Sequence, residues 1–310
     1  MTLSKEQYEK DAAVLRKAME GWGTDEGPII EVSAKRSNAD RQQIAKIYKT
    51  CYGKDLIKDL EDELGGNLQK VVLALYRTPV DYDCMELMRA MKGMGTNEDT
   101  LIEIICTRPK QRIEEIKARF LELYKETLEH WLLDELSGDI KRFLVALIQG
   151  GRSDTTNIDK AKLDKDVSDL YNAGENKLGT DEEVFIKLFS LRSPAELKYI
   201  SQAYKKQVGR ELIESIDDEF SGDIKKALKA TLHAIIDPTD YFAERIKYAC
   251  KGLGTNDDIL IRVLVSRDEI DLKQIKEIYC KKFGLTLYQE IKDETSGDYK
   301  NMLLQIAMTD

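Results

Sequence analysis

The chain has 310 residues, of which 42% are apolar and 34% charged, and its formal net charge is −9. This length and apolar content can bury a large core in one to three domains, whereas the acidic balance argues against nucleic acid as a partner. No apolar run reaches about 18 residues, and residues 1–13 do not form a charged-then-apolar leader, so we expect neither a transmembrane helix nor a secretory signal.

Helices are predicted along the whole chain, because glycine and proline are sparse and apolar residues recur at helical spacing. We expect a short, mostly polar tail over 1–9, four homologous units, and a polar linker over 151–162 that is rich in Gly, Asp and Thr. The units are expected over 10–79, 80–150, 163–238 and 239–310. The expected fold class is therefore all-α, built from four repeats.

Each unit is predicted to contain about five helices. In the second unit, four of them are expected over 82–91, 111–124, 128–136 and 140–149. The remaining helix lies between the first two of these and is expected to begin at a cap on Thr96. In the third unit, Thr180 with Glu183 and Ser193 with Glu196 both match the capping box.

A loop with the pattern Gly-x-Gly-Thr marks the repeats, in altered form in the third unit. Its threonines are Thr24, Thr96, Thr180 and Thr255. A glutamate follows 40 residues after the second glycine of each loop, at Glu63, Glu135, Glu219 and Glu294. An arginine follows 12 residues after each threonine, at Arg36, Arg108, Arg192 and Arg267. The constant offset between loop and glutamate is the main indication of function.

A Gly-x-Gly turn can adopt backbone angles that are closed to residues with a β-carbon, so several carbonyl oxygens can point at one spot. Calcium takes about 6 to 8 oxygen ligands, and peptide carbonyls with one carboxylate and water are an ordinary set. One carboxylate leaves the ion with net positive charge and open positions, which a phosphate oxygen could fill. The loop therefore predicts a calcium bridge to an anion.

The alternative is that Gly-x-Gly-Thr is a helix C-cap followed by the next N-cap. Caps need no remote acid, however, and four copies with a carboxylate at one offset favour calcium. Four bound Ca²⁺ ions would change the net charge from −9 to −1, so calcium would also reduce repulsion from an anionic membrane.

Over essentially its whole length the chain resembles an annexin. The resemblance rests on four repeats of about 70 residues, the K-G-x-G-T loop with an acid about 40 residues on, and an SGD tripeptide after that acid at 137–139, 221–223 and 296–298. It implies a slightly curved disc of four five-helix domains. It also implies Ca²⁺ sites on the convex face that bind acidic phospholipid with phosphatidylserine-like headgroups.

The resemblance also implies the calcium ligands, which are backbone carbonyls and one glutamate in each repeat. In the first, second and fourth repeats these groups are Met19, Gly21, Gly23 and Glu63; Met91, Gly93, Gly95 and Glu135; and Cys250, Gly252, Gly254 and Glu294. In the first repeat, Glu20 replaces the usual Lys or Arg and Gly65 replaces the Ser of SGD. We expect calcium to bind there with weaker headgroup contact.

The third repeat departs further from the pattern. Lys177 stands where the other loops have their first glycine, and the implied ligands become the carbonyls of Gly174, Lys177 and Gly179 with Glu219. A residue with a side chain at this position is expected to give the loop a different resting shape.

The residue between the two glycines is apolar in every loop. These residues are Trp22, Met94, Leu178 and Leu253. We hypothesise that they dip into the lipid interface, where tryptophan is common. The alternative is that they only cover the loop.

By resemblance, Asp83, Glu103, Arg108 and Arg262 surround a central hydrophilic passage linked to proposed ion conduction. Structural pairing would explain them as well, since a buried arginine needs a partner. The other repeated arginines are expected to bond helix ends within their units.

No enzymatic motif is present. The two histidines, His130 and His233, lack a zinc spacing or a nucleophile elbow, and the loop lacks the third glycine of a dinucleotide site. We therefore expect a calcium-dependent, reversible, peripheral membrane-binding protein rather than an enzyme. The alternatives are a helical-repeat scaffold for protein partners and a calcium-gated ion conductor.

The five cysteines are odd in number and scattered through apolar helical patterns, so we expect buried free thiols in a cytoplasmic protein. The calcium-dependent lipid binding that the resemblance implies would recruit this protein to the inner face of membranes when calcium rises. The tail lacks the amphipathic arm with which some annexins recruit EF-hand proteins, so no such partner is predicted. Lateral self-association on the membrane is left open.

Overall fold

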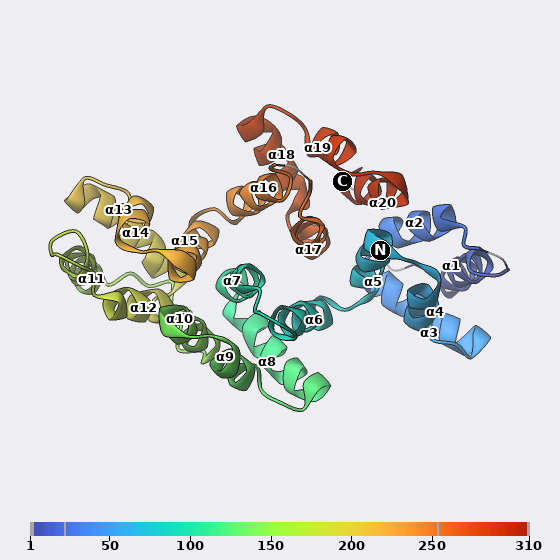
Figure 1. Cartoon of the computed structure of the whole chain (residues 1–310), viewed down its shortest axis with the longest axis horizontal. Helices are drawn as coiled ribbons and strands as arrows, with labels where there is room; N and C mark the ends of the chain where they lie inside the picture. Colours follow the sequence, from blue (N-terminus) through green and yellow to red (C-terminus); the bar gives the residue numbers. More distant parts are fainter. Residues whose placement is uncertain (1–2, 22, 253, 309–310) are drawn as a thin grey trace. The chain divides into compact units, whose positions relative to one another are not determined.

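The computed structural model describes residues 3–21, 23–252 and 254–308, and within these ranges it is all-α, with twenty helices and no strand (Figure 1). The chain forms two compact units. One comprises Met1–Tyr82 with Phe242–Asp310, and the other comprises Asp83–Tyr241. Within the described part of the chain, no helix has both the length and the apolar character needed to cross a bilayer.

The first unit holds two groups of helices from the two ends of the chain. They are α1 (Lys5–Ala18), α2 (Glu26–Lys35), α3 (Asn38–Tyr52), α4 (Leu56–Glu63) and α5 (Gly66–Tyr76), with α17 (Asp257–Arg267), α18 (Leu272–Phe283), α19 (Leu287–Glu294) and α20 (Gly297–Met308). Helix α1 begins inside the segment that was expected to be a tail. Two further helices, α6 (Pro79–Met91) and α16 (Pro238–Ala249), run across the points at which the chain divides.

The second unit holds the middle of the chain. Its helices are α7 (Glu98–Thr107), α8 (Lys110–Tyr124), α9 (Leu128–Glu135), α10 (Gly138–Ile148), α11 (Lys160–Ala173), α12 (Glu182–Leu191), α13 (Pro194–Val208), α14 (Leu212–Glu219) and α15 (Gly222–Ile236). The five helices predicted for the second repeat are confirmed as α6 to α10, with ends that differ by a few residues.

Of the helix N-caps predicted from the sequence, one is confirmed and two are wrong. The capping box of Ser193 and Glu196 is confirmed at the start of α13. Thr96 and Thr180 are not caps, because α7 and α12 begin one residue later, with Asn97 and Asp181 in the cap positions. The threonine hydroxyls have other partners, which lie in the loops.

Each unit joins two helix groups through the same kind of contact. In the first unit α2 packs against α20 and α5 against α17; in the second, α7 packs against α15 and α10 against α12. The second helix of one group thus packs against the fifth helix of the other. Every residue of α7 from 100 to 106 is buried, as expected for a helix that is apolar nearly all round.

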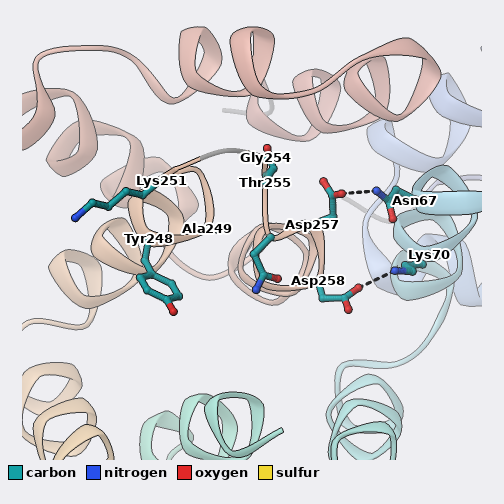
Figure 2. A pocket seen from close by; sticks show the side chains of 10 residues that line it. Asn67, Lys70, Tyr248, Ala249, Lys251, Gly254, Thr255, Asp257 and Asp258 are labelled. Carbon is teal, nitrogen blue, oxygen red and sulfur yellow. Dashed lines mark hydrogen bonds and ion pairs between the residues drawn. The ribbon is translucent and has the colours of Figure 1, made fainter.

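Equivalent ion pairs cross two of these contacts. Lys70 on α5 donates to Asp258 on α17 over 2.9 Å, beside an open pocket of about 610 Å³ next to the fourth loop (Figure 2). Lys226 on α15 donates to Asp99 on α7 over 3.0 Å, and its bonds to Asp99 and Asp223 raise the pKa of Lys226 to about 12. Such exposed pairs add little stability, and they lie at the starts of α7 and α17.

The expected linker contains no helix between Ile148 and Lys160, but it is bonded to the second unit. Arg152 donates to the carbonyl of Phe189 over 2.6 Å, and the amide of Ser153 donates to the carbonyl of Leu191 over 2.9 Å. The segment is therefore held against α12.

The expectation of five buried thiols is wrong for two of them. Cys84, Cys106 and Cys250 are buried and free, whereas Cys51 and Cys280 are free and exposed. Both exposed residues lie in the last turns of helices, α3 and α18, of which only one side is packed.

Candidate calcium-binding loops

The repeated loops connect the first and second helices of each group, and glycine permits their backbone shape. The second glycine has a positive φ in all four: 83° at Gly23, 86° at Gly95, 78° at Gly179 and 88° at Gly254. The first glycine of three loops also has a positive φ: 105° at Gly21, 128° at Gly93 and 112° at Gly252. Residues with a β-carbon rarely take these angles, so the sequence pattern encodes this turn.

A backbone hydrogen bond closes each loop at its base. The residue after the threonine donates its amide to the carbonyl of an alanine at the end of the preceding helix. The pairs are Asp25 to Ala18 (2.9 Å), Asn97 to Ala90 (2.8 Å), Asp181 to Ala173 (2.7 Å) and Asn256 to Ala249 (2.7 Å). The third closure spans one residue more than the others.

The distant glutamate meets its loop in all four repeats, through the loop threonine. Each glutamate is the last residue of a short helix, α4, α9, α14 or α19. The distances from the threonine Oγ1 to the glutamate Oε2 are 2.9 Å for Thr24 and Glu63, 3.1 Å for Thr96 and Glu135, 2.5 Å for Thr180 and Glu219, and 3.2 Å for Thr255 and Glu294. The structure thus brings together residues that the sequence separates by 39 positions.

The same hydroxyl also lies near the backbone carbonyl of the glutamate. That distance is 3.3 Å at Glu63, 3.4 Å at Glu135, 3.2 Å at Glu219 and 3.0 Å at Glu294. The carboxylate oxygen is the nearer acceptor in the first three repeats, and the carbonyl is nearer in the fourth. One hydroxyl proton therefore ties the loop to the end of the short helix.

The donor set fits a hard cation. Each place offers loop carbonyls and one carboxylate, and oxygen ligands of this kind suit Ca²⁺. The thiol of Cys250 in the fourth loop does not compete as a ligand: its side chain is buried, and burial raises its pKa to about 12, with Glu290 and Glu294 adding to the effect. Cys250 can therefore offer only its carbonyl oxygen.

The third loop has a different backbone, as its sequence leads one to expect. Lys177 does not take the positive φ of the first glycines, and its amide donates to the carbonyl of Gly174 over 3.0 Å. Glu175 is held away from the loop by Arg210 and Ser215. A β-carbon on Gly174 would lie 3.2 Å from Cγ of Glu219, so this glycine allows the carboxylate to approach the loop.

The structure describes two of the four apolar residues at the tips of the loops, and both side chains are fully exposed to solvent. The exposed fraction is 106% for Met94 and 102% for Leu178. Trp22 and Leu253 lie outside the described residues. A tip without contacts to its own loop does not act as a cover, so the exposure of Met94 and Leu178 favours contact with something outside the chain.

Two of the residues expected around a central passage form a pair within the second unit. Arg108 donates to Asp83 over 2.8 Å, and both side chains are buried. Glu103 and Arg262 are buried as well, each in its own unit.

This pair is one of three equivalent pairs. Arg36 with Asp11 and Arg192 with Asp166 are the corresponding pairs in the first and third repeats, each with a shortest distance of 2.6 Å. In the fourth repeat Phe242 replaces the aspartate, and the Arg267 guanidinium lies 4.4 Å from its ring centre and bonds Asp271 instead. Because three repeats share this ion pair, its structural role accounts for it: the pair joins the first helix of a repeat to the end of the second helix.

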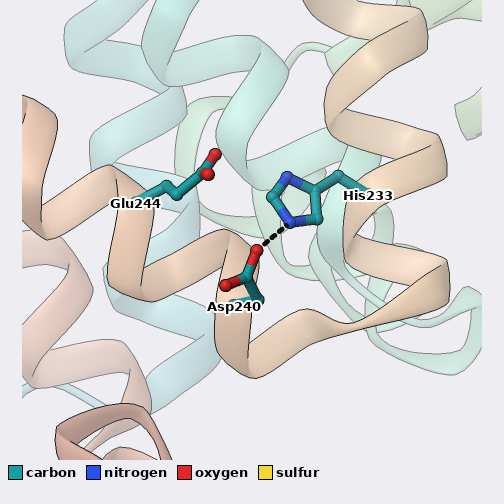
Figure 3. A group of neighbouring side chains, drawn as sticks. All are labelled: His233, Asp240 and Glu244. Carbon is teal, nitrogen blue, oxygen red and sulfur yellow. Dashed lines mark hydrogen bonds and ion pairs between the residues drawn. The ribbon is translucent and has the colours of Figure 1, made fainter. Parts of the chain in front are cut away.

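The histidines do not contribute to the loops. His130 is exposed on α9 near Asp134, and His233 on α15 bonds Asp240 over 2.7 Å (Figure 3). Sequence reasoning missed the role of the loop threonines, of which it treated Thr96 and Thr180 as caps. Their position directly before the true caps, at a constant 39 residues from the glutamate, was the available signal.

Comparison with known proteins gives consistent matches. The family model described as Annexin matches residues 10–75, 82–147, 165–231 and 241–306. Annexin A11 of Oryctolagus cuniculus is 45% identical over 298 residues, which is 96% of this chain and 59% of that protein. The chain thus spans about three fifths of the length of the first curated relatives that it matches.

Solved structures agree. A structure of annexin A8 matches with a TM-score of 0.96 and 42% identity, and the match covers all of this chain and 97% of that one. A calcium-bound annexin, (Sm)1, matches with a TM-score of 0.86 and 31% identity, covering all of this chain and 92% of that one.

Proposed function

The chain belongs to the annexin family, and from this premise we propose that it binds acidic phospholipid membranes reversibly, through Ca²⁺ held between its loops and lipid headgroups. The observation that carries this proposal is that a glutamate carboxylate lies within 2.5 to 3.2 Å of the loop threonine hydroxyl in all four repeats. Carbonyls of the loop and the glutamate would hold the ion. The bound ion would supply positive charge with coordination positions left open for phosphate oxygens.

We assign the same ligands to each site as the sequence suggested. In the first, second and fourth repeats they are the carbonyls of the residue at the end of the helix and of the two glycines, with Glu63, Glu135 or Glu294. In the third repeat they are Gly174, Lys177 and Gly179 with Glu219. The Gly174 carbonyl already accepts a bond from Lys177, which leaves its second lone pair for the ion.

Several weak sites on one chain act together, so membrane binding should be steep in calcium and lost on chelation. The net charge of −9 opposes contact with an anionic surface in the absence of the ion. We propose that in a cell this protein is cytoplasmic and moves to the inner face of membranes when calcium rises.

Cosedimentation with vesicles tests this function. The protein should pellet with phosphatidylserine vesicles in calcium, remain in the supernatant with excess EGTA or with magnesium alone, and return to the supernatant when EGTA follows calcium. Phosphatidylcholine vesicles serve as the neutral control. Equal sedimentation with and without calcium, or none at any calcium concentration, would reject the proposal.

The exposed tips provide a further prediction. Met94→Ser with Leu178→Ser should raise the lipid concentration needed for half-maximal binding about 30-fold. Each apolar side chain moved from water into the interface contributes roughly 1 kcal/mol, less than full burial would, so the two together contribute about 2 kcal/mol. Leu121→Ser, at an exposed leucine on α8, is the matched control and should change nothing. If the double variant and the Leu121→Ser control had the same effect on vesicle binding, the tips would have no special contact with lipid.

A further inference from the structure

The loop threonines make the same side-chain contact four times, and neither capping nor packing accounts for it. The caps of α2, α7, α12 and α17 are the residues that follow the threonines. In each repeat the hydroxyl instead lies 2.5 to 3.2 Å from the carboxylate of the glutamate at the end of the short helix. A contact kept through four different loop sequences indicates a shared task.

We propose that the threonines are positioning residues, which hold the glutamate carboxylates in place before calcium arrives. They are Thr24, Thr96, Thr180 and Thr255. This inference rests on the proposed function, because it assigns the glutamates as calcium ligands. The inference goes beyond the proposed function because it assigns a role to four side chains that do not themselves contact the ion.

The site needs such a component because its donors come from two separate helix junctions. The carbonyls belong to the loop before α7, for example, and Glu135 to the end of α9. A free glutamate side chain samples many rotamers, and ordering it on ion binding weakens affinity. Thr96 joins the two junctions directly, so part of that ordering is already present without the ion.

A hydroxyl is suited to this role chemically. An ionised carboxylate has about four lone-pair positions, and one hydroxyl proton uses only one of them, so the rest remain for the ion. Hydrogen bonds to a charged acceptor are the stronger kind. The β-branch of threonine also restricts χ1, which keeps the hydroxyl aimed at the glutamate better than serine would.

The test compares a valine series with a serine series in the full chain. Replacing all four threonines by valine keeps their shape and removes the hydroxyl, whereas serine keeps the hydroxyl. The calcium concentration for half-maximal binding to phosphatidylserine vesicles should rise about tenfold with valine, the lower end of the range for residues that support metal ligands, and about twofold or less with serine. Thr50→Val with Thr156→Val, at two exposed threonines, is the control and should match the wild type.

A second measurement needs no calcium and no lipid. In EGTA, the single substitution Thr96→Val should speed amide hydrogen exchange at Asn97, whose amide closes the loop, about tenfold relative to wild type and to Thr96→Ser. Unchanged exchange with unchanged calcium dependence would overturn the positioning role. Equal effects of valine and serine would also overturn it, because they would indicate packing rather than the hydroxyl.

The two proposals fail in different ways. If Glu135→Gln raises the calcium requirement and the valine series does not, only the positioning role is wrong. If the wild-type protein does not bind vesicles at all, the proposed function is wrong, while the exchange measurement still decides whether Thr96 holds Glu135.

Discussion

A chain with glutamine in place of all four site glutamates is expected to stay in the supernatant at calcium concentrations that sediment the wild type with phosphatidylserine vesicles. The replaced residues are Glu63, Glu135, Glu219 and Glu294. Glutamine keeps the size and one acceptor oxygen, but it removes the only side-chain charge assigned to each ion. Since supporting residues alone are worth about 10- to 100-fold in metal affinity, the loss of a charged ligand should exceed about 100-fold at each site.

The control variant must change the net charge by the same amount as the four substitutions at the sites. Glutamine at four exposed glutamates that are not assigned as ligands does so, one in each repeat: Glu31, Glu126, Glu214 and Glu277. This control should bind vesicles as the wild type does or slightly better, because it carries four fewer negative charges. If the two chains lost binding to the same extent, total charge rather than the four sites would govern the interaction.

The substitution Asp166→Ala is expected to lower the free energy of unfolding by about 3 kcal/mol, the lower end for breaking a buried ion pair because Arg192 keeps some contact with water. Arg192 bonds Asp166 through two nitrogens, at 2.6 and 2.8 Å, and this pairing raises the pKa of Arg192. Without the aspartate, a guanidinium remains in a mostly buried position. Urea unfolding followed by circular dichroism measures the change.

Asp169→Ala on the same helix is the matched control. Asp169 pairs with Lys165 at 2.6 Å, but both side chains are well exposed, so its loss should cost less than about 0.5 kcal/mol. Calcium-dependent vesicle binding at room temperature should survive Asp166→Ala, because the pair lies away from the loop and Glu219. Equal destabilisation by the two substitutions would show that the repeated arginine pairs do not stabilise the fold.

The sequence alone determined the helices, the four loops and the identity of the glutamates. Helix periodicity is a local property, and a Gly-x-Gly turn is encoded by the residues that form it, which is why α6 to α10 were predicted within a few residues. An altered shape of the third loop was also expected from Lys177, since a residue with a side chain avoids the positive φ of Gly93; the loop is one residue longer as well.

The cap of α7 shows where local reasoning fails. Thr96 and Asn97 are both good capping residues, and the sequence gives no reason to choose between them. The choice depends on a competing partner for the Thr96 hydroxyl, and that partner, Glu135, is brought in by the fold. The exposure of Cys51 and Cys280 was likewise unpredictable, because a residue near a helix end can face either the core or solvent.

Only the tertiary structure decided that each glutamate meets its loop through a threonine hydroxyl and that the second helix of one group packs on the fifth helix of another. These contacts join residues that lie 39 or more positions apart, and a constant spacing shows that two residues recur together without showing which atoms touch. The packing of α7 on α15, or of α5 on α17, depends on the shapes of whole buried helix faces, which no short motif encodes.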